Sequence, residues 1–300
     1  MKLPFLINRN PDKTIIVQSI SGCLKTAYSG IANSAVFILL VISTLLVITA
    51  CRREPAWEPL FNGENLDNWD KYLGSSLGPE WDDLAEAATA EEVFSVVKEN
   101  GVNVIRISGE INGSLATRES FENYHLRLVF KWGDNVYSRR NSGLLYHSFG
   151  DFGTAFGTWM PNIEFQMMHQ NLGDTYLMEN TTCETEVEFD EERDEFVYTP
   201  GAQALTFGEH ANGRLIRKSF DNEAPLGQWN TLDLYCIGRT AVHIVNEMTL
   251  MENNNTGAYE DGEILPLSSG KIQIQSEGAE LFIRSIDIRP IREIPSALLP

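Results

Sequence analysis

The short run at 163–167 (IEFQM) holds the first candidates for chemistry, because Glu164 and Gln166 share the face opposite its apolar members. His147 and His169 flank this run in the sequence. A carboxylate and an amide flanked by histidines can exchange protons and hydrogen bonds with a hydroxylated ligand. We interpret this face as a surface that handles sugars. The alternative is a polar sheet face that is only wetted by solvent.

Three further stretches carry residues suited to binding a sugar. Gln275 and Glu277 alternate with apolar residues, so their side chains share one face and are expected to line a groove beside Glu164. Trp159 lies in a loop rich in glycine and aromatic residues, where its ring could stack on the C–H groups of a pyranose. His243 lies in an apolar, strand-like run and is either a packed or solvated histidine or a contact to the ligand.

A second set of carboxylates stands further along the chain. Glu184, Glu186 and Glu188 would share one side of a strand. The run Glu186-Val-Glu188-Phe-Asp190-Glu191 faintly resembles the paired-carboxylate strand of β-glucanases. The charge cluster continues through Glu195, however, and a solvated loop explains it more simply. We therefore expect the segments 184–195 and 253–262 to be long loops.

The composition favours an acidic globular protein. Of the 300 residues, 43% are hydrophobic and 10% are aromatic, which is enough apolar material for a core. The formal net charge is −19, and because residues 1–50 hold four basic residues and one acid, the remainder carries −22. So acidic a chain repels phosphate backbones. We therefore expect no nucleic-acid partner and favour a neutral or cationic ligand, or a soluble glycan.

The N-terminus carries the pattern of a targeting segment. Residues 31–49 form an almost uninterrupted apolar run of about the length that one helix needs to cross a membrane. The run ends in ITAC, which resembles a bacterial lipobox, where the cysteine is lipidated after cleavage. We expect a leader at 1–50, lipidation of Cys51 and a linker at 51–56. The protein would be lipid-anchored in the cell envelope, facing the periplasm or the surface; a retained membrane anchor is the alternative.

Two cysteines, Cys183 and Cys236, belong to the part of the chain that follows the leader. In an oxidising compartment they could form a disulfide, and two buried thiols are equally compatible with the sequence. No CxxC pair or zinc-like spacing occurs, so we expect no metal ion held by cysteines.

Short β-rich runs separated by turn residues dominate the chain after residue 93. The pair Asn100-Gly101 is typical of a two-residue hairpin turn, and the Ala- and Glu-rich segment 82–92 is the best candidate for a short surface helix. We find neither βαβ alternation nor an internal repeat. The pattern therefore predicts an all-β sandwich of two antiparallel sheets with few short helices.

Six motifs recur in the order typical of one known family. They are FNG…L…W from Phe61, TRESFENYHLRLVFKWGD from Thr117, NSGLLYH from Asn141, IEFQ from Ile163, GQWNTLDLYCIGRTAVHIVN from Gly227 and GKIQIQSEGAELFIRSIDIRPI from Gly270. In these motifs the chain resembles the 3-keto-disaccharide hydrolase domain family, over nearly all of residues 57–291. The resemblance implies a concanavalin A-like jelly roll at 57–293, followed by a tail at 294–300.

The resemblance also implies cleavage of glycosides whose sugar carries a ketone at carbon 3. A base would remove the proton at carbon 2, the substituent at carbon 1 would leave by elimination, and water would add to the product. Glu164 or His147 is the expected base. His147, His169, Asn141 and Gln166 would polarise the ketone, either directly or through a bound divalent metal ion. Asn141 could instead cap the turn that follows it.

Two other functions remain compatible with the sequence. A carbohydrate-binding or surface-scaffold protein would keep the fold and the polar groove without catalysis. A conventional glycoside hydrolase would use two carboxylates on an unoxidised sugar. In every case the expected partner is a carbohydrate, and the expected contacts are Asn141, Gln166, Trp159, His243, Gln275 and Glu277.

Overall fold

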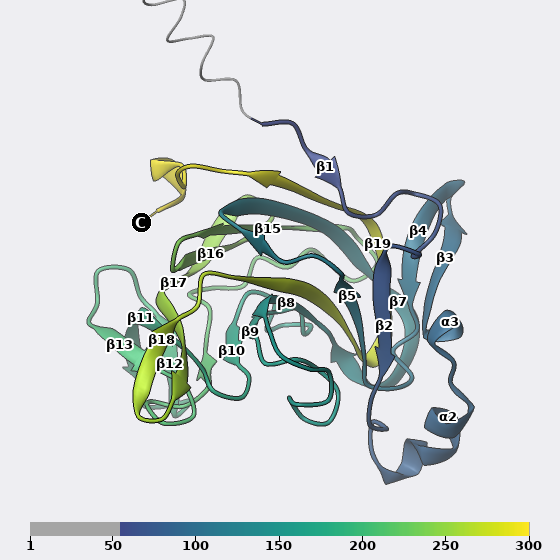
Figure 1. The fold of residues 1–300 in the computed structure, drawn as a ribbon, viewed down its shortest axis with the longest axis horizontal. Coiled ribbons are helices and arrows are strands. Elements are labelled where there is room, and N and C mark those ends of the chain that lie inside the picture. The colour runs from purple at the N-terminus through teal and green to yellow at the C-terminus, as the bar shows by residue number, and fades with distance from the viewer. Residues whose placement is uncertain (1–54, 300) are drawn as a thin grey trace, which may run out of the picture. The chain divides into compact units, whose positions relative to one another are not determined.

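Two antiparallel β-sheets pack face to face in the computed structural model, which describes residues 55–299 (Figure 1). The predicted all-β jelly-roll sandwich is thereby confirmed. Its helices are short: α2 spans Asp82–Ala87, α3 spans Ala90–Val93, and the 3-10 helices η1 and η2 span Pro79–Trp81 and Ser296–Leu298. The leader and Cys51 lie outside the described residues. Within 55–299, none of the helices is long and apolar enough to cross a membrane.

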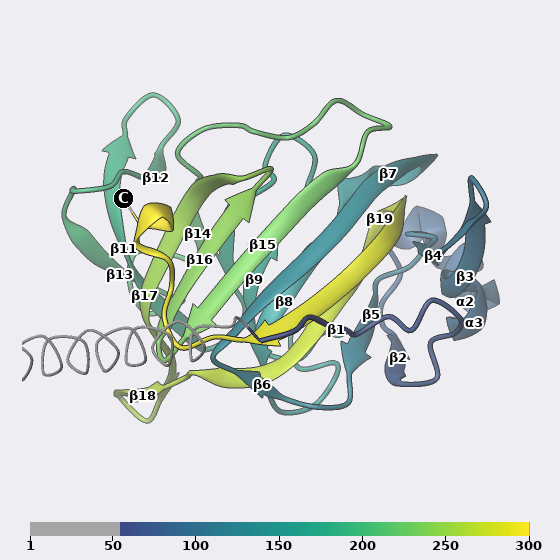
Figure 2. The same cartoon turned by 90° about the horizontal axis from the view of Figure 1, so that it is seen from above.

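The first sheet, which we call the back sheet, has its strands side by side across one face of the molecule (Figure 2). In hydrogen-bonded order it contains β3 (Phe94–Glu99), β4 (Val102–Ile107), the second half of β19 (Ser269–Pro290), β7 (Tyr124–Asn141), β15 (Asn230–Ile237), β16 (Thr240–Val245) and β17 (Met248–Glu260). The short strand β1 (Glu58–Pro59) also pairs with this half of β19.

The second sheet, which we call the front sheet, lies beneath the back sheet in Figure 1. Its strands are β2 (Trp69–Leu73), β5 (Gly113–Thr117), the first half of β19, β8 (Gly143–Ser148), β9 (Ile163–Gln166), β10 (Thr175–Leu177) and β14 (Leu215–Ile216). At one end, β11 (Thr181–Asp190) pairs with β12 (Glu195–Tyr198), β13 (Ala204–Phe207) and β17, and β18 (Glu263–Pro266) pairs with β17. The two-residue strand β6 (Phe121–Glu122) pairs with the start of β19.

Strand β19 belongs to both sheets. Its residues 273–276 pair with β5 in the front sheet, and its residues 281–283 pair with β4 in the back sheet. Between them lies Gly278, whose φ of +94° is a backbone conformation that other residues rarely adopt. A Cβ at this position would fall 2.3 Å from Ser138 Oγ. The change of sheet leaves Glu277 paired with Asn141, the last residue of β7.

One hydrophobic core lies between the sheets. From β7, Leu126, Leu128 and Phe130 enter this core and are fully buried. Ile272 and Ile274 of β19 enter it from the front sheet. Their polar neighbours in the sequence therefore point to the opposite side of that sheet.

The hairpin predicted at Asn100-Gly101 is also confirmed. Strands β3 and β4 pair on either side of it, with Glu99 opposite Val102. Asn100 and Gly101 have φ values of +50° and +83°, and positive values at both positions are what a type I′ turn requires.

The two loops expected at 184–195 and 253–262 are wrong. The first is the hairpin of β11 and β12, and most of the second lies in β17. The charge run misled the prediction, because the glutamates of β11 occupy its more exposed face while Thr185 and Val187 are buried on the other. Asn253 is buried within its strand, and its amide is hydrogen-bonded to Thr185 and Thr175.

The two cysteines are free thiols, so the possible disulfide does not form. Cys183 and Cys236 are fully buried, and burial raises the pKa of each thiol to about 12. A thiol that stays protonated is a weak nucleophile. Both residues therefore act as core side chains.

We expect Gly278→Ala to destabilise the protein by about 1–3 kcal/mol more than a glycine substitution with the same backbone strain and no close neighbours. Gly262→Ala is the matched control, because Gly262 has a φ of +93° and nothing within 4 Å of its Cβ position. Urea unfolding of both variants measures the difference. Equal losses would show that the close approach at Gly278 contributes nothing.

Candidate active site

A cavity of about 400 Å³ lies on the side of the front sheet that faces away from the core. The connection between β8 and β9 runs on that side of the sheet (Figure 1). Residues from this connection, from the front-sheet strands and from the end of β7 line the cavity. They are Ser75, Asn112, Arg139, Asn141, Phe156, Trp159, Glu164, Gln166, Tyr176, Met178 and Glu277.

Glu164 is the most deeply buried acid of this cavity. It lies in β9, opposite Leu145 of β8 and Tyr176 of β10, and its residue is 2% exposed. Its Oε1 atom has no hydrogen-bond partner among the described residues. Burial raises the pKa of Glu164 well above its usual range, and the negative charges of Glu277 and Asp174 add to the shift. Burial therefore favours the protonated form of this carboxyl.

Glu277 is the second acid of the cavity, and it is held differently. Its side chain is 22% exposed and lies 4.0 Å from the Arg139 guanidinium. Burial raises the pKa of Glu277 to about 7, while Arg139 and a hydrogen bond from Asn141 oppose the shift. Glu277 is therefore present in both protonation states near neutral pH.

Amide side chains surround the two acids. Asn141 is 3% exposed, and its Oδ1 atom has no hydrogen-bond partner within residues 55–299. Gln166 accepts a hydrogen bond from the Met168 backbone N–H through its carbonyl oxygen, at 3.0 Å, which leaves its NH₂ group to donate. Gln275 is fully buried behind this wall, with neither amide atom hydrogen-bonded in the described part of the chain.

Gly143 makes room for two of these groups. A Cβ there would fall 2.4 Å from Glu164 Oε1 and 2.6 Å from Gln275 Oε1. The missing side chain therefore leaves a cradle in which the two unpartnered polar groups face each other across the β8 backbone. The structure thus brings Glu164, Gln275 and Glu277 to the same side of the front sheet, where periodicity had predicted them.

Trp159 is not the open stacking platform that was expected. It is 4% exposed, donates its indole N–H to the Gly113 carbonyl oxygen at 2.9 Å, and packs with Leu145. Its role at the cavity is to hold the β8–β9 connection against the sheet. Phe156 and Tyr176 lie closer to solvent, with ring centroids 6.4 Å apart, and they are the aromatic residues free to contact a ligand.

His147 does not line the cavity, contrary to its assignment as a catalytic residue. It is fully buried, and neither ring nitrogen has a hydrogen-bond partner among the residues described. Burial lowers the pKa of His147 to about 4, so the ring is neutral at physiological pH. Its φ of +51° places it in a bulge, where Ser148, not His147, pairs with Lys271.

His243 lies between the sheets, so its assignment as a ligand contact is wrong. The ring stacks on Phe165 with a centroid distance of 4.1 Å and is fully buried. Nδ1 donates to the Gly173 carbonyl oxygen at 3.3 Å, and Nε2 accepts from the Tyr146 hydroxyl at 3.2 Å. Burial lowers the pKa of His243 to about 3. It is a hydrogen-bonded core histidine.

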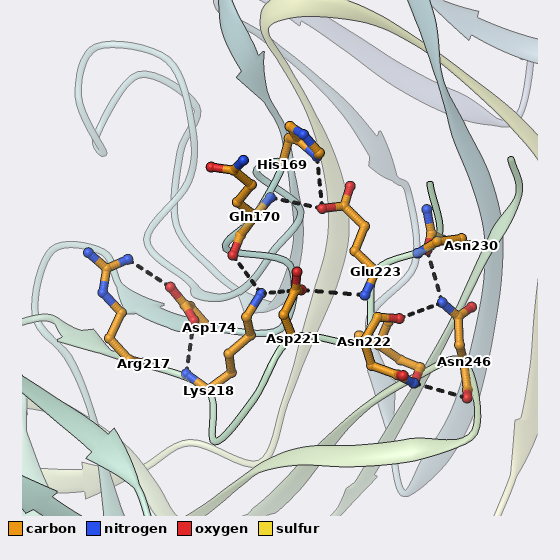
Figure 3. Close-up of polar contacts among 12 residues, drawn as sticks. His169, Gln170, Asp174, Arg217, Lys218, Asp221, Asn222, Glu223, Asn230 and Asn246 are labelled. Atoms are coloured by element: carbon orange, nitrogen blue, oxygen red, sulfur yellow. Dashed lines mark hydrogen bonds and ion pairs between the residues drawn. The ribbon is translucent and has the colours of Figure 1, made fainter. Parts of the chain in front are cut away.

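His169 belongs to a polar network in the segment that follows β9 (Figure 3). Its Nδ1 donates to Glu223 Oε2 at 2.9 Å, and the Gln170 backbone N–H donates to the same oxygen at 2.8 Å. In the same view Arg217 pairs with Asp174 at 2.8 Å. His169 therefore holds the segment after β9 in place and does not reach the cavity lining.

The sequence did not predict several of the residues that line the cavity. Arg139, Ser75 and Asn112 come from segments whose composition is that of ordinary surface. The only available signal for Arg139 was its position two residues before the NSGLLYH motif. Spacing along the chain could not show that these segments meet.

The donor set offers no obvious metal centre. Within residues 55–299, no group of three or more His, Cys, Asp or Glu side chains is placed so that it could hold a metal ion.

Comparison with known proteins identifies the family. The family described as the 3-keto-alpha-glucoside-1,2-lyase-like domain matches residues 56–289. The chain belongs to this family. This membership supports a carbohydrate-active function, and the cavity of acids, amides and aromatic rings in this chain suits a carbohydrate ligand. No curated protein matches the chain.

Solved structures show distant similarity. Two proteins from Parabacteroides distasonis ATCC 8503, both provisionally named glycosyl hydrolases, are 20% and 16% identical, with TM-scores of 0.44 and 0.45. Each alignment covers 79% of this chain, and it covers 100% and 95% of the respective relative. A β-glucanase from Bacillus licheniformis is 12% identical over 80% of this chain and 100% of its own, with a TM-score of 0.39. Similarity this low carries no information about the substrate.

We expect Glu164→Gln to raise the thermal midpoint more at pH 8 than at pH 5. In the folded protein the pKa of Glu164 lies above its unfolded value of 4.5, so its contribution to stability is lost as pH rises above 4.5. Glutamine does not titrate and escapes this loss. Calorimetry should show a gain of at least about 2 °C at pH 8, which corresponds to roughly 1 kcal/mol in a domain of this size.

The exposed Glu263 on β18 supplies the control for this measurement. Glu263→Gln removes the same charge from a solvated position, so its thermal midpoint should follow that of the wild type at both pH values. A difference between Glu164→Gln and wild type that does not grow with pH would contradict the protonated state assigned to Glu164.

Proposed function

We propose that this protein cleaves glycosides whose sugar carries a ketone at carbon 3, by proton abstraction, elimination and hydration. Membership of the 3-keto-alpha-glucoside-1,2-lyase-like family supports this substrate class. One observation supports the chemistry best: two carboxyl groups share a cavity and hold their protons differently. Pairs of acids with separated pKa values are typical of sites that need both an acid and a base.

The ketone makes such a bond cleavable by an ordinary carboxylate. It acidifies the proton on carbon 2, because the electron pair left on that carbon delocalises onto the ketone oxygen. Loss of the substituent at carbon 1 then forms a carbon 1–carbon 2 double bond conjugated with the ketone. Addition of water at carbon 1 gives the free 3-keto sugar, so that the net reaction is hydrolysis.

Glu277 is the base in this proposal. With a pKa of about 7 it is partly ionised at neutral pH, and an efficient base has its pKa near the working pH. Its partly exposed side chain can meet a substrate that enters the cavity. This replaces Glu164 as the expected base, because a carboxyl that burial keeps protonated cannot accept the proton.

Glu164 is assigned the complementary role. A neutral carboxyl in a buried site donates a hydrogen bond to the ketone oxygen, and the bond strengthens as negative charge develops there. The NH₂ group of Gln166 is a second donor in the same wall of the cavity. These two residues would stabilise the enolate that forms when Glu277 removes the proton.

The protons balance with Glu277 alone. After the first step Glu277 carries the proton from carbon 2. Glu277 then donates this proton to the oxygen that leaves carbon 1. In the second step the ionised Glu277 takes a proton from a water molecule while the oxygen of that water adds to carbon 1. That proton returns to carbon 2, and the site is restored.

We expect the protein to turn over a 3-keto-glucoside and not its unoxidised parent, and Glu277→Gln to lower kcat by about 10²–10⁴-fold. Because the base must be ionised, kcat/KM should rise about tenfold per pH unit below pH 7 and level off above it. Steady-state kinetics between pH 5 and pH 9 measure both effects, with Glu263→Gln as the control.

Other outcomes would favour a different function. Turnover of the parent at a similar rate would indicate a conventional glycoside hydrolase. Binding without turnover of either compound would indicate a carbohydrate-binding protein. If Glu277→Gln keeps more than a tenth of the wild-type activity, Glu277 is not the base.

We also propose that the protein is held in the cell envelope by a lipid on Cys51, with the domain facing the periplasm or the surface. The apolar run at 31–49 and the ITAC sequence that ends at Cys51 support this location. Cells expressing the full chain should incorporate radiolabelled palmitate into it, and Cys51→Ala should abolish the labelling. Labelling that persists in the variant would overturn the assignment of Cys51.

A further inference from the structure

A second cavity, of about 310 Å³, adjoins the first. It is lined by Leu77, Asn112, Ser138, Arg139 and Glu277. Asn112, Arg139 and Glu277 line both cavities, so Glu277 lies at the boundary between them. A ligand longer than one sugar ring could therefore occupy both cavities and contact Glu277 between them.

The proposed mechanism sets the order in which the atoms of the substrate lie across this boundary. Carbons 3, 2 and 1 are consecutive ring atoms. With the ketone at Glu164 in the first cavity and the carbon 2 proton at Glu277, carbon 1 and its substituent extend beyond Glu277. The leaving group then points into the second cavity, past Arg139.

Arg139 gives the second cavity its chemical character. Among the residues lining either cavity within 55–299, it is the one cationic side chain. The side chain is 66% exposed, and it approaches Glu277 only to 4.0 Å, at the limit of an ion pair. Asn112 donates its NH₂ group to Ser75 Oγ and to the Ser76 carbonyl oxygen, so it contributes an acceptor. The guanidinium is thus the strongest donor available to a group bound here.

We propose that the second cavity binds the leaving group and that Arg139 selects leaving groups that carry a carboxylate. This inference rests on the proposed function. A guanidinium presents two parallel N–H donors that match the two oxygens of a carboxylate. The net charge of −19 repels anionic ligands over most of the surface. Near Arg139 the positive charge of the guanidinium reduces this repulsion, so a carboxylate would bind there.

Two aryl 3-keto-glucosides test the inference, one with a 4-carboxyphenol and one with a 4-carbamoylphenol leaving group. The two leaving groups have nearly the same shape and differ in charge. Wild-type protein should favour the carboxylate by about fivefold to tenfold in kcat/KM at low salt. In 1 M salt, where the Debye length is about 3 Å, the ratio should fall toward one.

The ratio in Arg139→Gln should be close to one at either salt concentration. Because both substrates use the same base, any change that this variant causes in Glu277 cancels from the ratio. Arg139→Lys, which keeps the charge and loses the planar fork, should retain part of the preference. Arg193→Gln is the matched control, since Arg193 is 70% exposed, lies between β11 and β12, and lines neither cavity.

Failure of this inference is distinct from failure of the proposed function. Equal kcat/KM values for the two substrates in wild type would overturn the selection by Arg139 and leave the cleavage reaction standing. If neither substrate reacts, the proposed cleavage reaction is wrong. Calorimetric titration with the unoxidised carboxy and carbamoyl glucosides then tests the anion site by binding alone. Tighter binding of the carboxy compound, lost in Arg139→Gln, supports the anion site, and equal affinities overturn it.

Discussion

The passage of β19 from one sheet to the other is the constraint on which the site depends. Gly278 allows it, because its positive φ and the close approach of Ser138 leave no place for a side chain. The passage leaves Glu277 at the end of the front-sheet half of β19 and opposite Asn141, where β7 ends and the chain continues into β8. Two strands far apart in the sequence thus deliver an acid and an amide to one point.

Burial then distinguishes two acids of the same chemical type. Glu164 lies within β9, between β8 and β10, and is almost fully covered, whereas Glu277 keeps a partly exposed side chain beside a cation. The desolvation penalty is therefore larger for Glu164, and the repulsion between the acids favours a single ionised group. Burial thereby favours the protonated form of Glu164, while Glu277, with a pKa of about 7, is partly ionised near neutral pH.

Much of this arrangement could be predicted from local pattern. A period of two fixes which residues of a strand share a face, so Glu164 with Gln166, and Gln275 with Glu277, were assigned correctly to polar faces. Strand order is set by long-range pairing, which no short window contains, so Arg139 was missed. The same limit explains why His243 was wrongly assigned as a ligand contact. A histidine in an alternating strand can face either the core or the solvent, and the sequence does not show which face the other sheet covers. In β11 the charged residues lie on the exposed face of a strand, and this run of charge was interpreted as a loop.

The choice of Glu277 as the proposed base depends on a feature even further from the local sequence. Trp159 anchors the β8–β9 connection through Gly113 and packs against Leu145, the residue opposite Glu164. If that connection were absent, water would reach Glu164, its desolvation penalty would shrink, and its pKa would fall toward the ordinary value. Glu164 would then ionise more readily, and the ketone of the proposed substrate would lose its hydrogen-bond donor. The tryptophan therefore matters to the chemistry by excluding water from a carboxyl group, a role for which stacking on a sugar is unnecessary.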